Sequence, residues 1–222
     1  MTDTITNTTS SAPAGAFRSL SALVLASNSP RRRDLLGSLG LELSICPSNA
    51  AEPLPWPQEE PEAYAMRMAR LKTLDVAVLY PEAAVLGADT IVVLPASAGA
   101  AAQVLGKPEN DADALRMLTL LSGRAHLVVT GCCLALPGPL LGQNEPCCFA
   151  ETTEVVMRAS SPAELAAYIA TGEPSDKAGA YAIQGLGAFL VERVSGSYTN
   201  VVGLPVAECC RLLLDRGLIA AR

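Results

Sequence analysis

Apolar and polar positions along the chain follow two spacings, one typical of buried strands and one typical of the helices that cover them. Short continuous apolar runs between turn residues predict strands. These runs cover residues 23–26, 84–94, 126–136, 149–157 and 181–194, the last with a bend marked by Gly185 and Gly187. Apolar residues at every third or fourth position, started by Ser, Asn, Asp or Pro and stopped by Gly or Pro, predict helices. These segments cover about 30–40, 61–80, 111–123, 161–172 and 205–216.

The order of these elements predicts an α/β fold. Helices alternate with strands, but the strands at 126–136 and 149–157 follow each other directly through a connection rich in Pro and Gly. That order favours a mixed β-sheet flanked by helices over a purely parallel, doubly wound sheet. No repeat or linker divides residues 21–222, so one domain is expected. Residues 1–20 have no signal-peptide core and are expected to form a loose tail, and residues 95–103 a loop.

Composition and charge narrow the classes of partner. Of the 222 residues, 50% are hydrophobic and 17% charged, so the chain can bury a sizeable core and is not a disordered protein. The net charge of −6 argues against long DNA or RNA, because polyanion binding needs a broad basic face. A small anionic ligand is compatible with this charge, since a local cluster of cations creates a positive pocket. No apolar run reaches membrane-spanning length, so no membrane is expected as a partner.

The cysteines do not form a metal-binding pattern. They are Cys46, Cys132, Cys133, Cys147, Cys148, Cys209 and Cys210. None belongs to a Cys-x-x-Cys motif and His126 is the single histidine, which argues against a structural zinc site. Free thiols in a reducing cytoplasm are the main interpretation, and a disulfide between the pairs 132/133 and 147/148 is the alternative.

The segment Ser27-Asn28-Ser29-Pro30-Arg31-Arg32-Arg33 has the features of a phosphate site. It follows a predicted strand, and Ser29 and Pro30 suit the cap and first position of a helix. The first N–H groups of that helix have no intrahelical partner and lie at the positive end of its dipole. Hydroxyls and guanidinium groups beside them favour an anion. The alternative is an ordinary capped helix with a solvated basic turn.

Asp89 stands in an otherwise almost wholly apolar run, residues 84–94. A buried carboxylate is costly unless it is hydrogen-bonded, paired or bound to a metal. It is therefore expected at a sheet edge, where it would hold a cation or orient water. The alternative is a turn aspartate after Gly87-Ala88.

Four further polar residues stand in restricted settings. Lys107 lies between Gly106 and Pro108, and Lys177 lies in a loop of small residues that a ligand can approach. The alternative for both residues is an ordinary solvated loop lysine. Gln184, on a predicted apolar strand, has an amide that could contact the edge of a base or satisfy backbone groups. His126 has no partner nearby in sequence and is interpreted as structural.

Several ordered segments together resemble the Maf family of nucleoside triphosphate pyrophosphatases from about Leu23 to Leu214. The matching segments are Ala26-Ser27-Asn28-Ser29-Pro30-Arg31-Arg32, Gly87-Ala88-Asp89-Thr90, Gly106-Lys107-Pro108, Leu121-Ser122-Gly123, Val129-Thr130-Gly131, residues 172–187 and Val201-Val202-Gly203-Leu204-Pro205. The chain has no Walker A motif, Gly-x-Gly-x-x-Gly motif or Gly-x-Ser-x-Gly elbow, which weakens kinase, dehydrogenase and serine-hydrolase readings.

The resemblance implies an elongated fold of the Maf/ITPase type with a central cleft, a divalent cation (Mg²⁺ or Mn²⁺) and a homodimer in the cytoplasm. It implies cleavage of a nucleoside triphosphate into the monophosphate and pyrophosphate. The Asp-Lys-Ala-Gly and Ile-Gln-Gly sequences resemble the subgroup that acts on dTTP and UTP. The alternatives are a pyrophosphatase for 7-methyl-GTP or a broader nucleotide range, and a nucleotide-binding regulator of septum formation with little catalysis.

The resemblance also implies roles for individual residues. Asp89 matches the proton-accepting carboxylate, and Arg31, Thr90 and Gln184 match positions associated with base choice. Asp89 and Glu52 are the expected metal ligands, with Lys72 in a supporting role. The expected phosphate-binding residues are Ser27, Arg31, Arg32, Lys107 and Lys177.

The chain departs from the family pattern in three places. Ala51-Glu52 stands where an acidic pair is common, so metal binding would depend more on Glu52. Ala125 replaces a common threonine before His126. The chain is longer than the family pattern at its N-terminus and around residues 95–103 and 137–147, and the resemblance says nothing of these segments.

Overall fold

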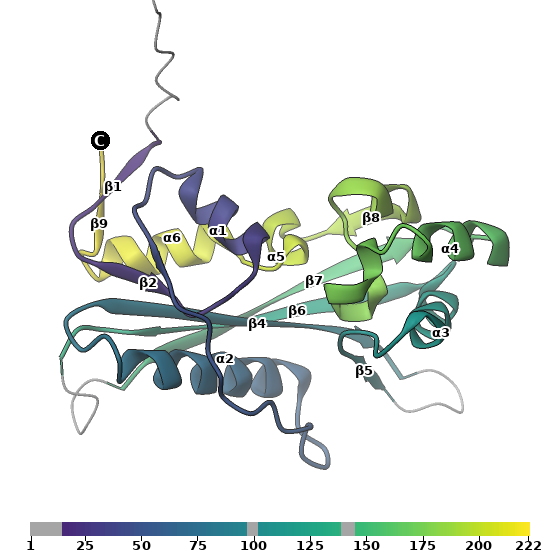
Figure 1. Ribbon diagram of the computed structural model, residues 1–222, viewed down its shortest axis with the longest axis horizontal. Helices are drawn as coiled ribbons and strands as arrows, with labels where there is room; N and C mark the ends of the chain where they lie inside the picture. Colours follow the sequence, from purple (N-terminus) through teal and green to yellow (C-terminus); the bar gives the residue numbers. More distant parts are fainter. Residues whose placement is uncertain (1–14, 97–101, 139–144) are drawn as a thin grey trace, which may run out of the picture.

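Among the described residues, seven strands form one mixed β-sheet along the length of the molecule (Figure 1). The computed structural model describes residues 15–96, 102–138 and 145–222. The strands of this sheet are β2 (Leu23–Leu25), β3 (Ser44–Ile45), β4 (Ala84–Leu94), β5 (Gln103–Leu105), β6 (Ala125–Ala135), β7 (Cys147–Met157) and β8 (Val191–Ser195). Their order is β3-β2-β4-β6-β7-β8, and β5 adds to β4. β2 is parallel to β3 and β4, whereas the other neighbours are antiparallel, which confirms the predicted mixed sheet.

Helices cover both faces of this sheet. They are α1 (Pro30–Gly37), α2 (Pro61–Ala77), α3 (Asp111–Leu121), α4 (Pro162–Ile169), α5 (Tyr198–Val202) and α6 (Val206–Asp215). The long α2 lies on one face, while α1, α5 and α6 lie on the other and α3 and α4 pack at the far end (Figure 1). Among the described residues, no helix has the length and apolar character needed to cross a membrane.

Two glycines let α2 lie unusually close to the sheet. A Cβ atom at Gly131 of β6 would overlap the backbone of Ala65, and one at Gly87 of β4 would overlap the hydroxyl of Thr73. The Thr73 hydroxyl instead donates to the carbonyl of Cys133 at 3.0 Å. The position of α2 over β4 and β6 is therefore fixed by small residues as well as by apolar packing.

Two hydrophobic cores lie under the helices opposite α2, one at each end of the molecule. The first includes Leu25, Leu36, Leu86, Leu134 and Leu213. The second includes Val92, Leu118, Leu121, Tyr168 and Leu190. Strand β4 passes from one core to the other, and its polar residues, Asp89 and Thr90, stand between them. The two cores therefore pack against β4 on either side of its two polar residues and fix the position of the strand between them.

Two of the predicted helix starts are confirmed by side-chain caps. The side chain of Asn110 accepts the N–H of Asp113, and Ser161 and Glu164 form a capping box. Pro30 begins α1 as predicted, although Ser29 makes no side-chain cap hydrogen bond. Helix α2 ends at Ala77, earlier than the predicted end at residue 80.

The prediction of a strand over residues 181–194 is largely wrong. Only Val191–Ser195 is a strand, and residues 185–190 form the 3₁₀ helix η3 (Gly185–Leu190). Gly185 has a φ of 79°, which is outside the extended region, and Gly187 packs against the hydroxyl of Tyr168. An apolar run can thus be buried in tight turns as well as in a strand.

The first and last strands of the described residues pair in a small second sheet. Strand β1 (Phe17–Ser19) pairs antiparallel with β9 (Ile219–Ala221). The predicted loose tail is therefore wrong for Phe17–Ser19, while residues 1–14 lie outside the described residues. The predicted loop at 95–103 gives way to β5 at Gln103, and residues 97–101 again lie outside the described part.

One pair of cysteines is not free. Cys133 and Cys148 form a disulfide, so the main interpretation of free thiols is wrong for them and the alternative pairing is confirmed. The two residues are direct partners on the antiparallel strands β6 and β7, which puts their side chains on one face at short range. Five cysteines remain free: Cys46, Cys132, Cys147, Cys209 and Cys210.

Candidate active site

A cavity of about 510 Å³ opens where the edge of β4 is uncovered. Strand β2 pairs with Ala84–Leu86 of this edge and β5 with Val92–Leu94. Between these pairings, no strand within the described ranges borders residues 87–91 on that side. Neighbouring side chains of β4 point to opposite faces, so the cavity meets Asp89 on the α2 side and Thr90 on the other.

All ten residues singled out from the sequence line this cavity. They are Ser27, Arg31, Arg32, Glu52, Lys72, Asp89, Thr90, Lys107, Lys177 and Gln184. They come from the loop before α1, the first turn of α1, the loop before α2, α2 itself, β4, the loop after β5, and residues 177–184. The predicted convergence is confirmed, while the role of each residue stays a prediction.

Asp89, Lys72 and Glu52 form a compact charged group. The Lys72 ammonium lies 2.6 Å from a carboxylate oxygen of Asp89 and 2.8 Å from one of Glu52. Burial acts to lower the pKa of Lys72, but the two carboxylates outweigh it and raise the pKa. Burial acts to raise the pKa of Glu52, and the hydrogen bond and charge of Lys72 reverse this and lower it. Lys72 is therefore a cation held between two carboxylates. Asp89 lies in the middle of β4 with its side chain on the face that α2 covers, so its partner Lys72 comes from that helix.

The loop that presents Glu52 is anchored to α2 by a second ion pair. Arg67 donates to both carboxylate oxygens of Glu59, at 2.7 and 2.6 Å. Its guanidinium also lies 4.0 Å from the centre of the Trp56 ring. A bidentate pair of this kind fixes geometry as well as charge. Sequence reasoning missed Arg67 and Glu59, which stand eight residues apart across a helix start.

Arg32 is used inside the protein. Its guanidinium donates four hydrogen bonds of 2.7 to 3.1 Å that join three segments. The acceptors are the hydroxyls of Ser27 and Thr90 and the carbonyls of Ala88 and Gly203. Burial lowers the pKa of Arg32. Because four of its five N–H groups are engaged, Arg32 cross-links the uncovered edge of β4 and has one donor left for the phosphate contact predicted from the sequence.

Arg31, Lys107 and Lys177 make fewer hydrogen bonds inside the protein than Arg32 does. Arg31 lies 3.3 Å and Lys177 lies 2.5 Å from oxygens of Asp176, and Lys177 also donates to the carbonyl of Glu173 at 2.7 Å. Lys107 has no ion-pair partner within the part of the chain that the structure describes. Its loop is tied to the 178–180 turn by a hydrogen bond from Gly179 to Gly106. These three cations line the cavity from three different segments of the chain.

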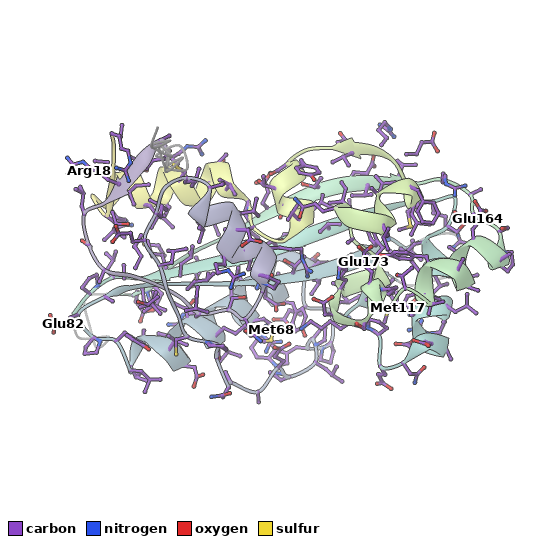
Figure 2. All side chains as sticks on the ribbon, turned by 45° about the horizontal axis from the view of Figure 1, so that its top comes forward. Arg18, Met68, Glu82, Met117, Glu164 and Glu173 are labelled. Atoms are coloured by element: carbon purple, nitrogen blue, oxygen red, sulfur yellow. A yellow bond between two sulfur atoms is a disulfide. The ribbon has the colours of Figure 1, made fainter. Side chains whose placement is uncertain are left out.

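Gln184 is exposed and sits just before η3, so the prediction that it lies on a strand is wrong. The carboxylate of Glu173 fixes the following turn by accepting the N–H groups of Leu186 and Gly187 at 3.0 and 2.7 Å. Glu173 lies between the end of the molecule marked by Arg18 and Glu82 and the end marked by Glu164 (Figure 2). Gln184 is thus held at the mouth of the cavity by a residue that sequence reasoning missed.

Two aromatic residues and His126 complete the surroundings. Tyr64 of α2 lines the cavity, and burial, then the charges of Asp89 and Glu52, raise the pKa of its hydroxyl. His126 is buried and its Nε2 lies 2.7 Å from the hydroxyl of Tyr181, another lining residue. Burial lowers the pKa of His126 to about 4, so the ring is neutral and structural, as interpreted from the sequence.

The cavity is positive in a chain that is negative overall. Its lining carries five cationic side chains and three carboxylates, whereas the whole chain has a net charge of −6. Among the described residues, no group of three His, Cys, Asp or Glu side chains forms a complete metal site. The pair Asp89 and Glu52 fits a magnesium-like ion only if oxygens of a bound phosphate join them.

Comparison with known proteins places this arrangement in a family. A protein from Oleidesulfovibrio alaskensis named dTTP/UTP pyrophosphatase is 47% identical over 205 residues, which is 92% of this chain and 90% of that protein. A protein of the same name from Nitratidesulfovibrio vulgaris is 47% identical and covers 92% of both chains. One from Anaeromyxobacter dehalogenans is 48% identical over 195 residues, 88% of this chain and 94% of its own. The family model described as Maf-like protein matches residues 22–216, and the chain belongs to the Maf family.

Proposed function

We propose that this protein hydrolyses dTTP and UTP to the nucleoside monophosphate and pyrophosphate. The observation that carries the proposal is one cavity in which the Asp89–Lys72–Glu52 group faces cations from three other segments. A triphosphate needs such cations, and its hydrolysis needs a carboxylate to handle the proton of the attacking water. The names of the relatives from three bacteria support the same substrates.

Asp89 is the proposed general base. The oxygen of water attacks the α-phosphorus and forms the new P–O bond, while Asp89 accepts a proton from that water. The bond between the α-phosphorus and the α–β bridging oxygen breaks, and its electron pair leaves with pyrophosphate. Lys72 keeps Asp89 oriented and neutralises part of the negative charge around the reacting phosphate.

Asp89 and Glu52 are the proposed ligands of a divalent cation, Mg²⁺ or Mn²⁺. Two carboxylates completed by substrate phosphates are a common set for magnesium, so the residues present fit the ion. When bound, the ion neutralises phosphate charge and steadies the leaving pyrophosphate. Arg31, Lys107 and Lys177 bind phosphate oxygens, and Arg32 and Ser27 hold the surrounding backbone in place.

Gln184 is the proposed reader of the base. Thymine and uracil present the same N–H and carbonyl edge, and a glutamine amide offers one acceptor and two donors to meet it. The exposed position of Gln184 at the mouth of the cavity suits that contact. Because both bases share this edge, the residue supports dTTP and UTP together. The homodimer and the cytoplasmic location implied by the resemblance stay predictions.

Pyrophosphate release from a nucleotide panel tests the function. The panel is dTTP, UTP, CTP, GTP and 7-methyl-GTP, each with Mg²⁺ or Mn²⁺ and with EDTA. We expect the monophosphate and pyrophosphate from dTTP and UTP first, and little product in EDTA. Faster release from 7-methyl-GTP would assign the chain to the other specificity, and no release from any nucleotide would contradict the proposed activity.

A further inference from the structure

Asp176 is a cavity residue that the proposed reaction leaves without a role. Its carboxylate lies between two cations from different walls, Arg31 at the start of α1 and Lys177 after the 3₁₀ helix η1 (Glu173–Asp176). The two cations are largely covered, with side-chain exposures of 25% and 12%, whereas Asp176 is 54% exposed. The anion of this group is therefore the member with room to move.

The carboxylate occupies the place of a phosphate. Within the described residues, Asp176 accepts the hydrogen bond that the Arg31 guanidinium donates, and the other partner of Lys177 is the uncharged carbonyl of Glu173. Burial acts to raise the pKa of Asp176, but the hydrogen bond from Lys177 and the charge of Arg31 lower it, so the residue is an anion at neutral pH. A phosphate oxygen placed between the two cations would take the position of this carboxylate and compete with it.

We propose that Asp176 is a tethered competitor of phosphate that holds Arg31 and Lys177 facing each other and weakens the binding of small phosphates to them. The inference rests on the proposed function. A tethered group competes at an effective concentration of about millimolar. The nucleotide substrate offsets this competition with contacts to its base and sugar, which free pyrophosphate lacks. After cleavage, the returning carboxylate therefore favours release of pyrophosphate and keeps the cavity selective for whole nucleotides.

The test is the affinity for inorganic pyrophosphate, measured by calorimetry in EDTA. Asp176→Asn keeps the size of the side chain and an oxygen for Lys177 but removes the charge. We expect this variant to bind pyrophosphate about tenfold more tightly than the unmodified protein. The reason is that the charged competitor, whose two ion pairs are partly exposed and therefore modest in strength, is removed. Asp34→Asn is the matched control, because Asp34 lies on α1 outside the cavity and pairs with the exposed Arg33. It makes the same change in net charge and should leave the affinity unchanged.

Asp176→Ala is the second variant, and it should tighten pyrophosphate binding in the same direction. Equal or weaker binding by either variant overturns the inference, as does an equal gain in Asp34→Asn. If the unmodified protein releases pyrophosphate from dTTP but Asp176→Asn binds it no more tightly, the inference fails and the proposed function stands. If pyrophosphate binds to none of the proteins, the proposed phosphate site fails as well.

Discussion

At the scale of single residues, Asp89 is the side chain on which the chemistry depends. Replacing it with Asn keeps its shape but removes the base and one of the two charges that hold Lys72. We expect Asp89→Asn to lower the rate of pyrophosphate release by roughly 10²–10⁴-fold. The measurement is turnover at saturating dTTP.

Thermal unfolding followed by circular dichroism separates a chemical effect from loss of the fold. Lys72 keeps Glu52 as a partner in the Asp89→Asn variant, so the melting curve should remain cooperative. A folded variant with nearly normal turnover would remove Asp89 from the proposed role. Asp34→Asn, which changes an exposed carboxylate outside the cavity, should keep full turnover.

His126 makes stability depend on pH. In the folded protein burial lowers its pKa from 6.5 to about 4, so the unfolded chain takes up a proton at pH values where the folded chain refuses it. The neutral ring thus contributes stability that is present above pH 6.5 and is lost as the pH falls toward 4. His126→Gln preserves a hydrogen bond to Tyr181 but does not titrate.

The unmodified protein should therefore lose about 2 kcal/mol more free energy of unfolding than His126→Gln between pH 7 and pH 5. Urea unfolding at both pH values measures the difference. Parallel losses in the two proteins would show that His126 is protonated in the folded state. Other acid-sensitive groups, such as the Glu164 cap, are common to both proteins and cancel.

At the scale of elements, α2 carries Lys72 to Asp89 and depends on its close approach to β6. Gly131→Ala places a methyl group against the backbone of Ala65, so α2 must move away from the sheet. Overpacking of this kind costs about 1–3 kcal/mol. We expect a lower melting temperature together with reduced pyrophosphate release, because the shift also separates Lys72 from Asp89.

Gly37→Ala is the matched control for this substitution. A Cβ atom at Gly37, the last residue of α1, meets nothing within 4 Å. Alanine in a helix is favoured over glycine by roughly 0.5–1 kcal/mol, so the variant should be as stable as the unmodified protein or slightly more stable. If Gly131→Ala behaved like Gly37→Ala, the close packing of α2 would not be what positions Lys72.

Elements that depend on local signals could be predicted from the sequence, and those that depend on distant partners could not. The start of α3 at Asn110 and the capping box at Ser161 use residues three positions apart. By contrast, the pairing of Phe17–Ser19 with the last strand joins segments about 200 residues apart in the sequence, well beyond the reach of a local signal. The apolar residues 181–190 carry no periodicity that separates a strand from buried 3₁₀ turns.

The site follows the same division. Its residue types were recognisable, because cations and carboxylates in apolar or glycine-rich settings need a partner or a ligand. Their contacts were not recognisable. Arg32 reaches acceptors on β4 and after α5, and Asp176 meets Arg31 from 145 residues away. A basic motif therefore identified an anion site but did not tell which arginine faces the anion and which one holds the backbone.

At the scale of the whole molecule, a positive cavity in a negative chain selects partners by size. Five cations line the cavity while the net charge is −6, so its attraction is local. At about 0.1 M salt the screening length is about 10 Å, and a long polyanion outside the cavity meets mainly the negative surface.

Tripolyphosphate is small enough to reach the cations. It should inhibit pyrophosphate release competitively with dTTP, whereas duplex DNA at the same phosphate concentration should not. Inhibition by DNA that falls steeply with salt would instead reveal a basic face outside the cavity, and equal inhibition by both polyanions would contradict selection by the cavity.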